Sequence, residues 1–141
     1  DIGLYLDITV RVKFGTADED KGLGSGENDY GLHVDIDKDV GNFTLSLGAG
    51  YTFIGSPSGF DYRDVVSAST GVSYRFSDAF SVNTFVSYRQ AVRAGAPNQL
   101  DVAPGLSYRL TDTQRMNAYL LFGLDDGSPD VGAGIAYSYT F

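Results

Sequence analysis

Apolar and polar residues alternate strictly along most of this chain. From Ile2 to Phe14 every even position is apolar, while the odd positions carry glycine, tyrosine, threonine and charged residues. Successive side chains of a β-strand point to opposite faces of a sheet, so a period of two predicts a strand with two unlike faces. The pattern constrains the fold strongly because it recurs along the rest of the chain.

The recurrences predict eight strands. We expect them over residues 2–14, 30–37, 43–53, 66–76, 80–89, 100–110, 116–124 and 131–141. The connections between them alternate long and short, which is typical of outer-membrane barrels with short periplasmic turns and long outer loops. We therefore predict an all-β fold in which residues 1–141 form one domain, an eight-stranded antiparallel up-and-down transmembrane β-barrel. Pro104 falls inside the sixth strand, where a bulge is expected.

Composition excludes several classes of function. The net charge is -8, from 10 Lys and Arg against 18 Asp and Glu, and so acidic a chain would be repelled by nucleic acid. The absence of cysteine excludes a disulfide framework and a thiolate metal site. No cofactor motif is present. Because the chain opens within a strand, we expect either that a leader has been removed or that this is part of a longer protein.

The polar face distinguishes a membrane barrel from a soluble, lipocalin-like one. It carries mostly Gly, Ser, Thr and Ala, which suit a narrow interior better than a water-exposed surface. Tyrosine and phenylalanine gather toward both ends of the strands, as the two interfaces of a bilayer select. We expect the bacterial outer membrane, with its lipid and lipopolysaccharide as partners. Tyr137, Tyr139 and Phe141 resemble the terminal strand signal that the barrel-insertion machinery recognises.

Charged residues on the inward face are the candidate site. They either line a pore or pair in a structural network, because an unpaired buried charge is costly. Inward glycines and serines favour the pore, since small side chains leave room for water. The inward residues are Asp7, Arg11, Lys13, His33, Asp35, Asp37, Arg75, Arg89, Asp101 and Arg109.

Two other kinds of site have partial support in the sequence. His33 and Asp35, with a serine such as Ser46 nearby, could suggest a hydrolase, but no nucleophile motif is present and we predict no enzyme and no catalytic residue. The acidic loop at residues 18–22 could hold calcium, but it lacks the ligand spacing of an EF-hand, and a solvated loop is favoured over a metal site. Divalent cations could also bridge the acidic outer loops to lipopolysaccharide phosphates.

Three segments carry a family resemblance. These are the loop 17–26 leading into Asp29 and Tyr30, the Tyr-Arg-Phe/Leu-Ser/Thr-Asp turns, and the ending 126–134. Over nearly its whole length the chain resembles the MetA-pathway of phenol degradation family, a family of outer-membrane barrel transporters in Gram-negative bacteria. Its members are typically longer, so the resemblance implies a C-terminal part or a shortened relative. It also implies uptake of aromatic or other small hydrophobic compounds.

The function predicted from these observations is a channel or transporter for small solutes, on family grounds. The alternative is a closed structural barrel whose interior is filled by salt bridges and which transports nothing. The two differ in what the inward arginines do. If the arginines form a packed network, replacing Arg75, Arg89 or Arg109 should destabilise the barrel. If they line a pore, the same change should hardly affect stability and should shift the ion selectivity.

Overall fold

The computed structural model describes residues 2–18, 21, 23–57 and 59–141. Within these ranges all regular structure is β, and the eight predicted strands are confirmed. No helix of the described residues is long and apolar enough to cross a membrane. The strands are β1 (Leu4–Lys13), β2 (Asp29–Val40), β3 (Phe43–Phe53), β4 (Val65–Arg75), β5 (Phe80–Arg89), β6 (Gln99–Arg109), β7 (Gln114–Gly123) and β8 (Val131–Tyr139).

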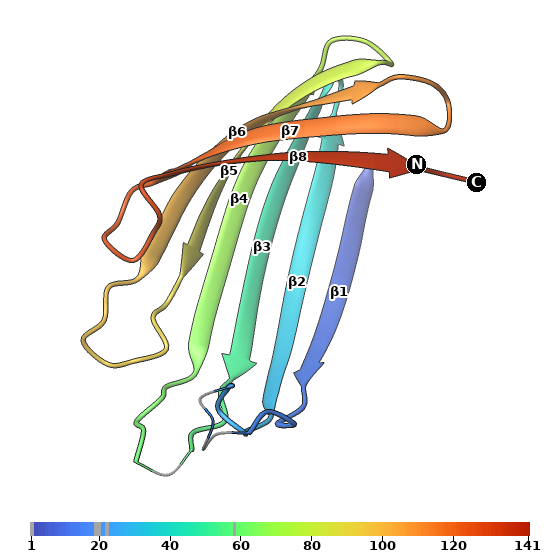
Figure 1. Ribbon diagram of the computed structural model, residues 1–141. Helices are drawn as coiled ribbons and strands as arrows, with labels where there is room; N and C mark the ends of the chain where they lie inside the picture. The colour runs from blue at the N-terminus through green and yellow to red at the C-terminus, as the bar shows by residue number, and fades with distance from the viewer. Residues whose placement is uncertain (1, 19–20, 22, 58) are drawn as a thin grey trace.

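The strands form one antiparallel sheet in which each strand pairs with the next along the chain. Short turns join the strands at one end of the sheet and the long loops lie at the other, as the alternating connection lengths predict (Figure 1). The tight turn between β2 and β3 has Gly41 at φ 63°, a left-handed conformation that glycine adopts without steric cost. The sheet curves into a trough with a concave and a convex face (Figure 1).

The sheet is not closed, so the predicted closed barrel is wrong for this structure. The ladders run from β1 to β8 without a pairing between those two strands. In Figure 1, β8 crosses the direction of β1 instead of running beside it. Each strand of a sheet is rotated against its neighbour by about 20–25°, and closure needs a tilt and stagger that bring the two edges into line. Here the accumulated twist leaves both edges open.

The convex face is apolar and uncovered. Among the described residues, Val65 is the only large side chain that is fully buried, at 1% exposure. By contrast, Ile8, Leu47 and Ile135 are 63%, 62% and 78% exposed. A water-soluble domain buries such side chains in a core, whereas this sheet places them on its outer surface.

Aromatic rings gather at both ends of the convex face, as predicted. At the short-turn end Tyr74 contacts Phe43 and Phe76, each with ring centroids 4.7 Å apart, and Phe76 stacks on Phe80 at 5.6 Å. At the long-loop end the rings of Tyr51 and Phe53 are 4.9 Å apart. The sheet therefore has an aromatic band at each end, with aliphatic side chains between the two bands.

On the concave face, larger side chains pack directly against several glycines. This differs from the expectation that the glycines leave room for water. A Cβ on Gly71 would overlap the ring of Phe85, and one on Gly134 would overlap the ring of Tyr119. Gly132 differs, because a Cβ there would meet Leu121 at an ordinary 3.6 Å. The rings that lie on the first two glycines fill part of the trough.

Pro104 interrupts one ladder without the expected bulge. It pairs with Thr84 of β5, but between β6 and β7 the ladder stops at Val102 and resumes at Gly105. Val102 pairs with Phe122 and Gly105 pairs with Tyr119, so the gap in the ladder spans the same number of residues on β6 as on β7. Neither strand therefore contains the extra residue that defines a bulge. The missing N–H of proline thus costs ladder bonds on one side while the strand continues.

Candidate functional site

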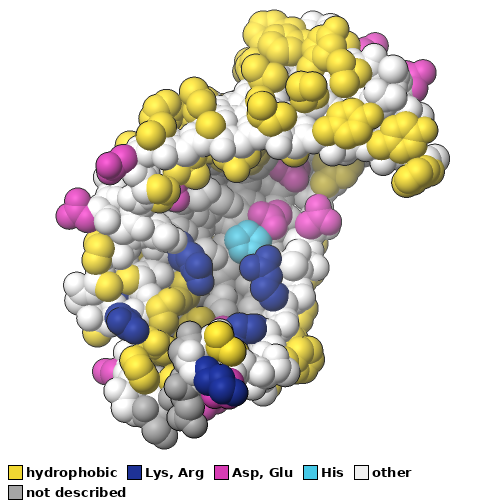
Figure 2. Space-filling view, viewed as in Figure 1, with side chains coloured by type: hydrophobic (Ala, Val, Ile, Leu, Met, Phe, Trp, Pro, Cys, Tyr) yellow, Lys and Arg dark blue, Asp and Glu magenta, His cyan; other side chains and the backbone are white. Residues whose placement is uncertain are grey.

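The polar face of the sheet is its concave face. Figure 2 shows Lys, Arg, His and acidic side chains gathered in the hollow, with hydrophobic side chains around its outside. The strand registers arrange the inward residues in rows across the sheet. One row contains Thr9, His33, Gly50, Ser67 and Arg89, each paired with the next.

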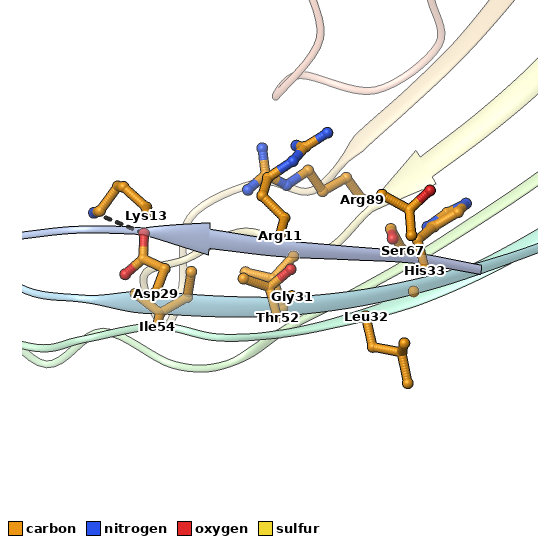
Figure 3. Close-up of a pocket in the computed structure, with 13 residues that line it drawn as sticks. Arg11, Lys13, Asp29, Gly31, Leu32, His33, Thr52, Ile54, Ser67 and Arg89 are labelled. Atoms are coloured by element: carbon orange, nitrogen blue, oxygen red, sulfur yellow. Dashed lines mark ion pairs between the residues drawn. The ribbon is translucent and has the colours of Figure 1, made fainter.

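A pocket of about 450 Å³ lies in the half of this face nearest the long loops. Strands β1 to β5 contribute most of its lining, and in Figure 3 the polar side chains stand on one side of the ribbon while Leu32 points away. Its volume falls within the usual range of about 300–1,000 Å³ for small-molecule sites. The lining consists of Thr9, Arg11, Lys13, Asp29, Gly31, Leu32, His33, Gly50, Thr52, Ile54, Val65, Ser67 and Arg89.

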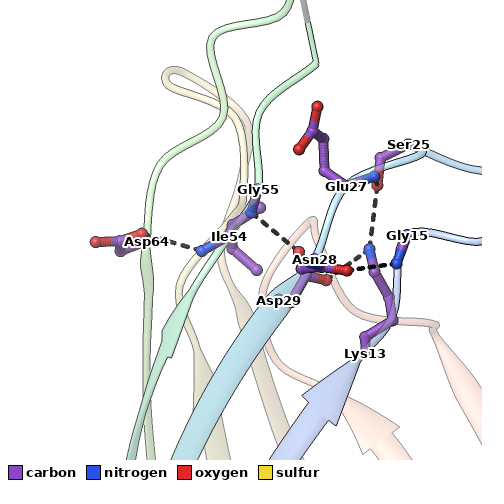
Figure 4. Close-up of polar contacts among 9 residues, drawn as sticks. All are labelled: Lys13, Gly15, Ser25, Glu27, Asn28, Asp29, Ile54, Gly55 and Asp64. Carbon is purple, nitrogen blue, oxygen red and sulfur yellow. Dashed lines mark hydrogen bonds and ion pairs between the residues drawn. The ribbon is translucent and has the colours of Figure 1, made fainter.

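Lys13 and Asp29 form an ion pair at the mouth of this pocket. Lys13 Nζ lies 2.6 Å from Asp29 Oδ2 and donates a hydrogen bond to Ser25 Oγ at 3.1 Å. The other carboxylate oxygen of Asp29 accepts a hydrogen bond from the backbone N–H of Gly55 at 3.0 Å (Figure 4). The charge of Lys13 is therefore balanced within the protein, and Asp29 joins the ends of β1 and β2 to the loop after β3.

His33 is held in place by its neighbours on the sheet. Its Nε2 lies 3.1 Å from Asp35 Oδ1. Beneath the ring is Gly50, where a Cβ would lie 2.6 Å from Ser67 Oγ and would overlap the imidazole. Ser46, considered above as a partner for His33, donates instead to Asp37.

Arg11 and Arg89 differ from Lys13 and His33, each of which has a carboxylate partner. Both line the pocket, and their side chains extend into it from β1 and β5 (Figure 3). Within the described residues neither guanidinium has an ion pair or a side-chain hydrogen bond. Among the residues that the structure describes, Asp29 is the only carboxylate in the lining and is paired with Lys13, so the described lining carries uncompensated positive charge.

The other predicted site residues lie on the same face outside the pocket. Asp7, Asp35 and Asp101 belong to the next row toward the short turns. Asp101 Oδ1 is buried there without a hydrogen-bond partner in the described structure. Arg75 and Arg109 lie at the short-turn end of β4 and β6. The alternation of the sequence places all of these residues on one face. It does not show that Arg11 and Arg89 share a pocket, or that Thr52, Ile54 and Val65 belong to its lining, because both depend on how the strands are arranged in space.

Hydrogen bonds join the two ends of the loop after β3 to each other and link this loop to the next long loop. Asp64 accepts hydrogen bonds from Ile54 N at 3.0 Å and Tyr51 Oη at 2.8 Å. Arg63 Nε donates to the carbonyl of Ala91 at 2.7 Å, which links the loop after β3 to the loop after β5. In the first loop, Asp18 pairs with Lys21 at 2.8 Å, whereas Glu19, Asp20 and Gly22 of the considered calcium site lie outside the described residues.

The last strand ends at Tyr139, whose ring meets that of Phe141 edge-on at 5.1 Å. Tyr137 and Tyr139 are 58% and 50% exposed on the short-turn band, and Phe141 has no cover. Their role as an insertion signal stays a prediction.

Comparison with known proteins identifies the family. The family described as "Putative MetA-pathway of phenol degradation" matches residues 1–141. The chain belongs to this family. The resemblance based on the first loop, the turns and the final hairpin is thereby confirmed for the whole sequence. No curated protein matches the chain. Membership in the MetA-pathway family connects the chain by name to phenol degradation and assigns no residue a role.

Proposed function

We propose that this chain forms the wall of an outer-membrane β-barrel that conducts or transports small solutes. The observation that carries the proposal is the uncovered apolar convex face opposite a polar concave one. Side chains such as Ile8, Leu47 and Ile135 are more than half exposed on the convex face. A lipid bilayer is the solvent in which such a surface is stable.

The two aromatic bands support the membrane part of the proposal. Tyr and Phe rings prefer the level of the lipid headgroups, and here they lie at both ends of strands that are 9 to 12 residues long. Membrane-spanning strands need about 9–11 residues when tilted. In this orientation the long acidic loops face lipopolysaccharide and the short turns face the periplasm.

The open edges set a requirement for the proposal. Within hydrocarbon every backbone N–H and C=O must be paired, so β1 and β8 must each gain a partner when the sheet enters the membrane. Strand direction alternates along the sheet, so β1 and β8 have opposite directions and would pair antiparallel if their edges met.

The polar pocket supports the transport part. It lies on the face that a closed barrel would enclose, and its lining of hydroxyl groups, arginines and the apolar side chain of Ile54 suits a small solute. The family's connection with phenol degradation is consistent with an aromatic compound as the cargo. The proposal assigns no catalytic step to the chain.

One observation favours the alternative of a closed structural barrel. Phe85 and Tyr119 lie against inward glycines and fill part of the trough. In a barrel of about eight strands, side chains of this size can occupy the interior completely. The alternative predicts a folded, inserted barrel that conducts no ions.

The test is ion conductance of the refolded chain in a planar bilayer. A shift in gel mobility on heating first establishes that the barrel has folded in lipid. Discrete current steps are expected if the concave face lines an aqueous path. A folded and inserted protein that gives no current supports the structural alternative, and a protein that folds only in the absence of lipid or detergent overturns both.

A further inference from the structure

The pocket on the concave face has an unusual balance of charge. Its lining contains three permanent cations, Arg11, Lys13 and Arg89, and one carboxylate, Asp29. The carboxylate lies 2.6 Å from Lys13 and also accepts a hydrogen bond from Gly55 N. In the described part of the chain, two positive charges of the lining are therefore left without a counter-charge there.

Those two charges are the guanidiniums of Arg11 and Arg89. They come from strands four positions apart in the sheet and enter the same hollow (Figure 3). Two like charges held in one small cavity repel each other, and an anion between them relieves that repulsion. A guanidinium also presents N–H donors in a planar fork that matches a carboxylate, so each arginine can bind both oxygens at once.

The rest of the lining indicates which anion is favoured. Thr9, Thr52 and Ser67 provide neutral hydroxyl groups beside the arginines. Ile54 is half-buried and gives the same pocket an apolar surface, whereas Val65, at 1% exposure, lies almost entirely beneath the surface. Inorganic anions make no use of an apolar wall, whereas a carboxylate attached to a small hydrocarbon body contacts both parts.

We propose that Arg11 and Arg89 form a recognition site for small organic carboxylates with an apolar body. The inference deepens the proposed transport function and rests on it for its biological role, although binding itself can be measured without transport. His33 is held by Asp35 and Gly50, so it contributes a fixed edge of the pocket. The site selects the anionic form of an aromatic compound over the neutral form.

Equilibrium binding tests the site directly. The full chain is folded in detergent micelles, and benzoate, benzyl alcohol and inorganic phosphate are titrated in turn by calorimetry. Benzoate is expected to bind at least tenfold more tightly than its neutral analogue, because charge-assisted hydrogen bonds are about twice as strong as neutral ones. Equal binding of benzyl alcohol overturns the role of the charge, and equal binding of phosphate overturns the role of the apolar wall.

Substitutions locate the site. Arg11→Gln and Arg89→Gln each remove one guanidinium and should each weaken benzoate binding roughly tenfold, since one charge-assisted contact is lost. Arg109→Gln removes the same charge from the short-turn end of this face and should leave binding unchanged. Equal losses for all three variants overturn the assignment in favour of a general attraction by the whole face. Arg11→Lys and Arg89→Lys keep the charge and serve where the glutamine variants fail to fold.

Conductance separates this inference from the proposed function. If the barrel conducts, the reversal potential in a salt gradient should favour anions, and Arg11→Gln should shift it toward cations while Arg109→Gln shifts it less. A conducting barrel without anion preference and without benzoate binding overturns the site but keeps the channel. A silent barrel that still binds benzoate through Arg11 and Arg89 keeps the site but overturns the channel.

Discussion

Replacing Leu47 by arginine tests whether the convex face contacts lipid. Leu47 lies near the middle of β3, is paired with Ile36 and Thr70 on the neighbouring strands, and is 62% exposed. Burying a leucine fully is worth about 1.5–3 kcal/mol, so the exposed part of this side chain gains roughly 1–2 kcal/mol from contact with hydrocarbon. Placing a guanidinium at the midplane of an outer-membrane barrel costs about 2–4 kcal/mol in total.

The control is the adjacent residue on the other face. Ser46 lies at nearly the same depth, and its hydroxyl donates to Asp37 on the concave face, so an arginine at this position gains a carboxylate partner. We expect Leu47→Arg to lower the free energy of unfolding by about 3 kcal/mol, roughly a hundredfold change in the folding equilibrium, and Ser46→Arg to change it by less than about 1 kcal/mol.

The assay is unfolding of the protein in lipid vesicles by guanidinium chloride. Tyrosine fluorescence and the heat-dependent gel shift monitor the unfolding. If the convex face is exposed to water, an arginine there behaves as an ordinary surface substitution and changes stability by at most about 0.5 kcal/mol. A small effect for Leu47→Arg together with a large one for Ser46→Arg would refute the assignment of lipid and lumen faces.

Three further changes test the packing of the concave face and its loops. Gly71→Ala forces a methyl group into the ring of Phe85 and should cost about 1–3 kcal/mol in the same unfolding assay, whereas Gly132→Ala makes only an ordinary van der Waals contact with Leu121 and should change stability by less than about 0.5 kcal/mol. Asp64→Ala removes the acceptor of two hydrogen bonds and should make the loop after β3 cleavable at lower protease concentration, while Asp64→Asn, which keeps an acceptor oxygen, resists cleavage better. Asp101→Asn removes the negative charge of a carboxylate that has one buried, unpaired oxygen, and should raise the unfolding midpoint by an amount worth about 1 kcal/mol; a lower midpoint would mean that the carboxylate has a partner when the protein is in the membrane.

Strand identity was predictable from the sequence because it depends on local information. The alternation at Phe43–Phe53 and Phe80–Arg89 predicts both strands with the bounds that the structure has. Closure was not predictable in the same way, because it depends on the twist and stagger accumulated over seven ladders. A period of two says nothing about either quantity.

The candidate site shows the same division. Alternation places Arg11 and Arg89 on the polar face, and that was predictable residue by residue. Their convergence on one pocket follows from four successive registers, in which a shift of one residue would turn a strand's side chains to the other face. The expectation that inward glycines such as Gly71 leave room for water fails for the same reason, since the ring that covers Gly71 belongs to its partner residue on the next strand.

The ties between the long loops have a consequence for how freely the loop sequences can vary. Asp29 bonds to the main chain of Gly55, Asp64 to that of Ile54, and Arg63 to that of Ala91. A bond to a main-chain atom is indifferent to the side chain of the residue it reaches. Ile54 and Ala91 can therefore change side chain without losing these bonds, whereas Gly55 cannot, because a Cβ there would lie 2.6 Å from the carbonyl oxygen of Asn28. The anchoring side chains of Asp29, Arg63 and Asp64 keep the loops in place while the residues between them vary. Grafting a foreign peptide between such anchors should leave the pocket beneath it intact.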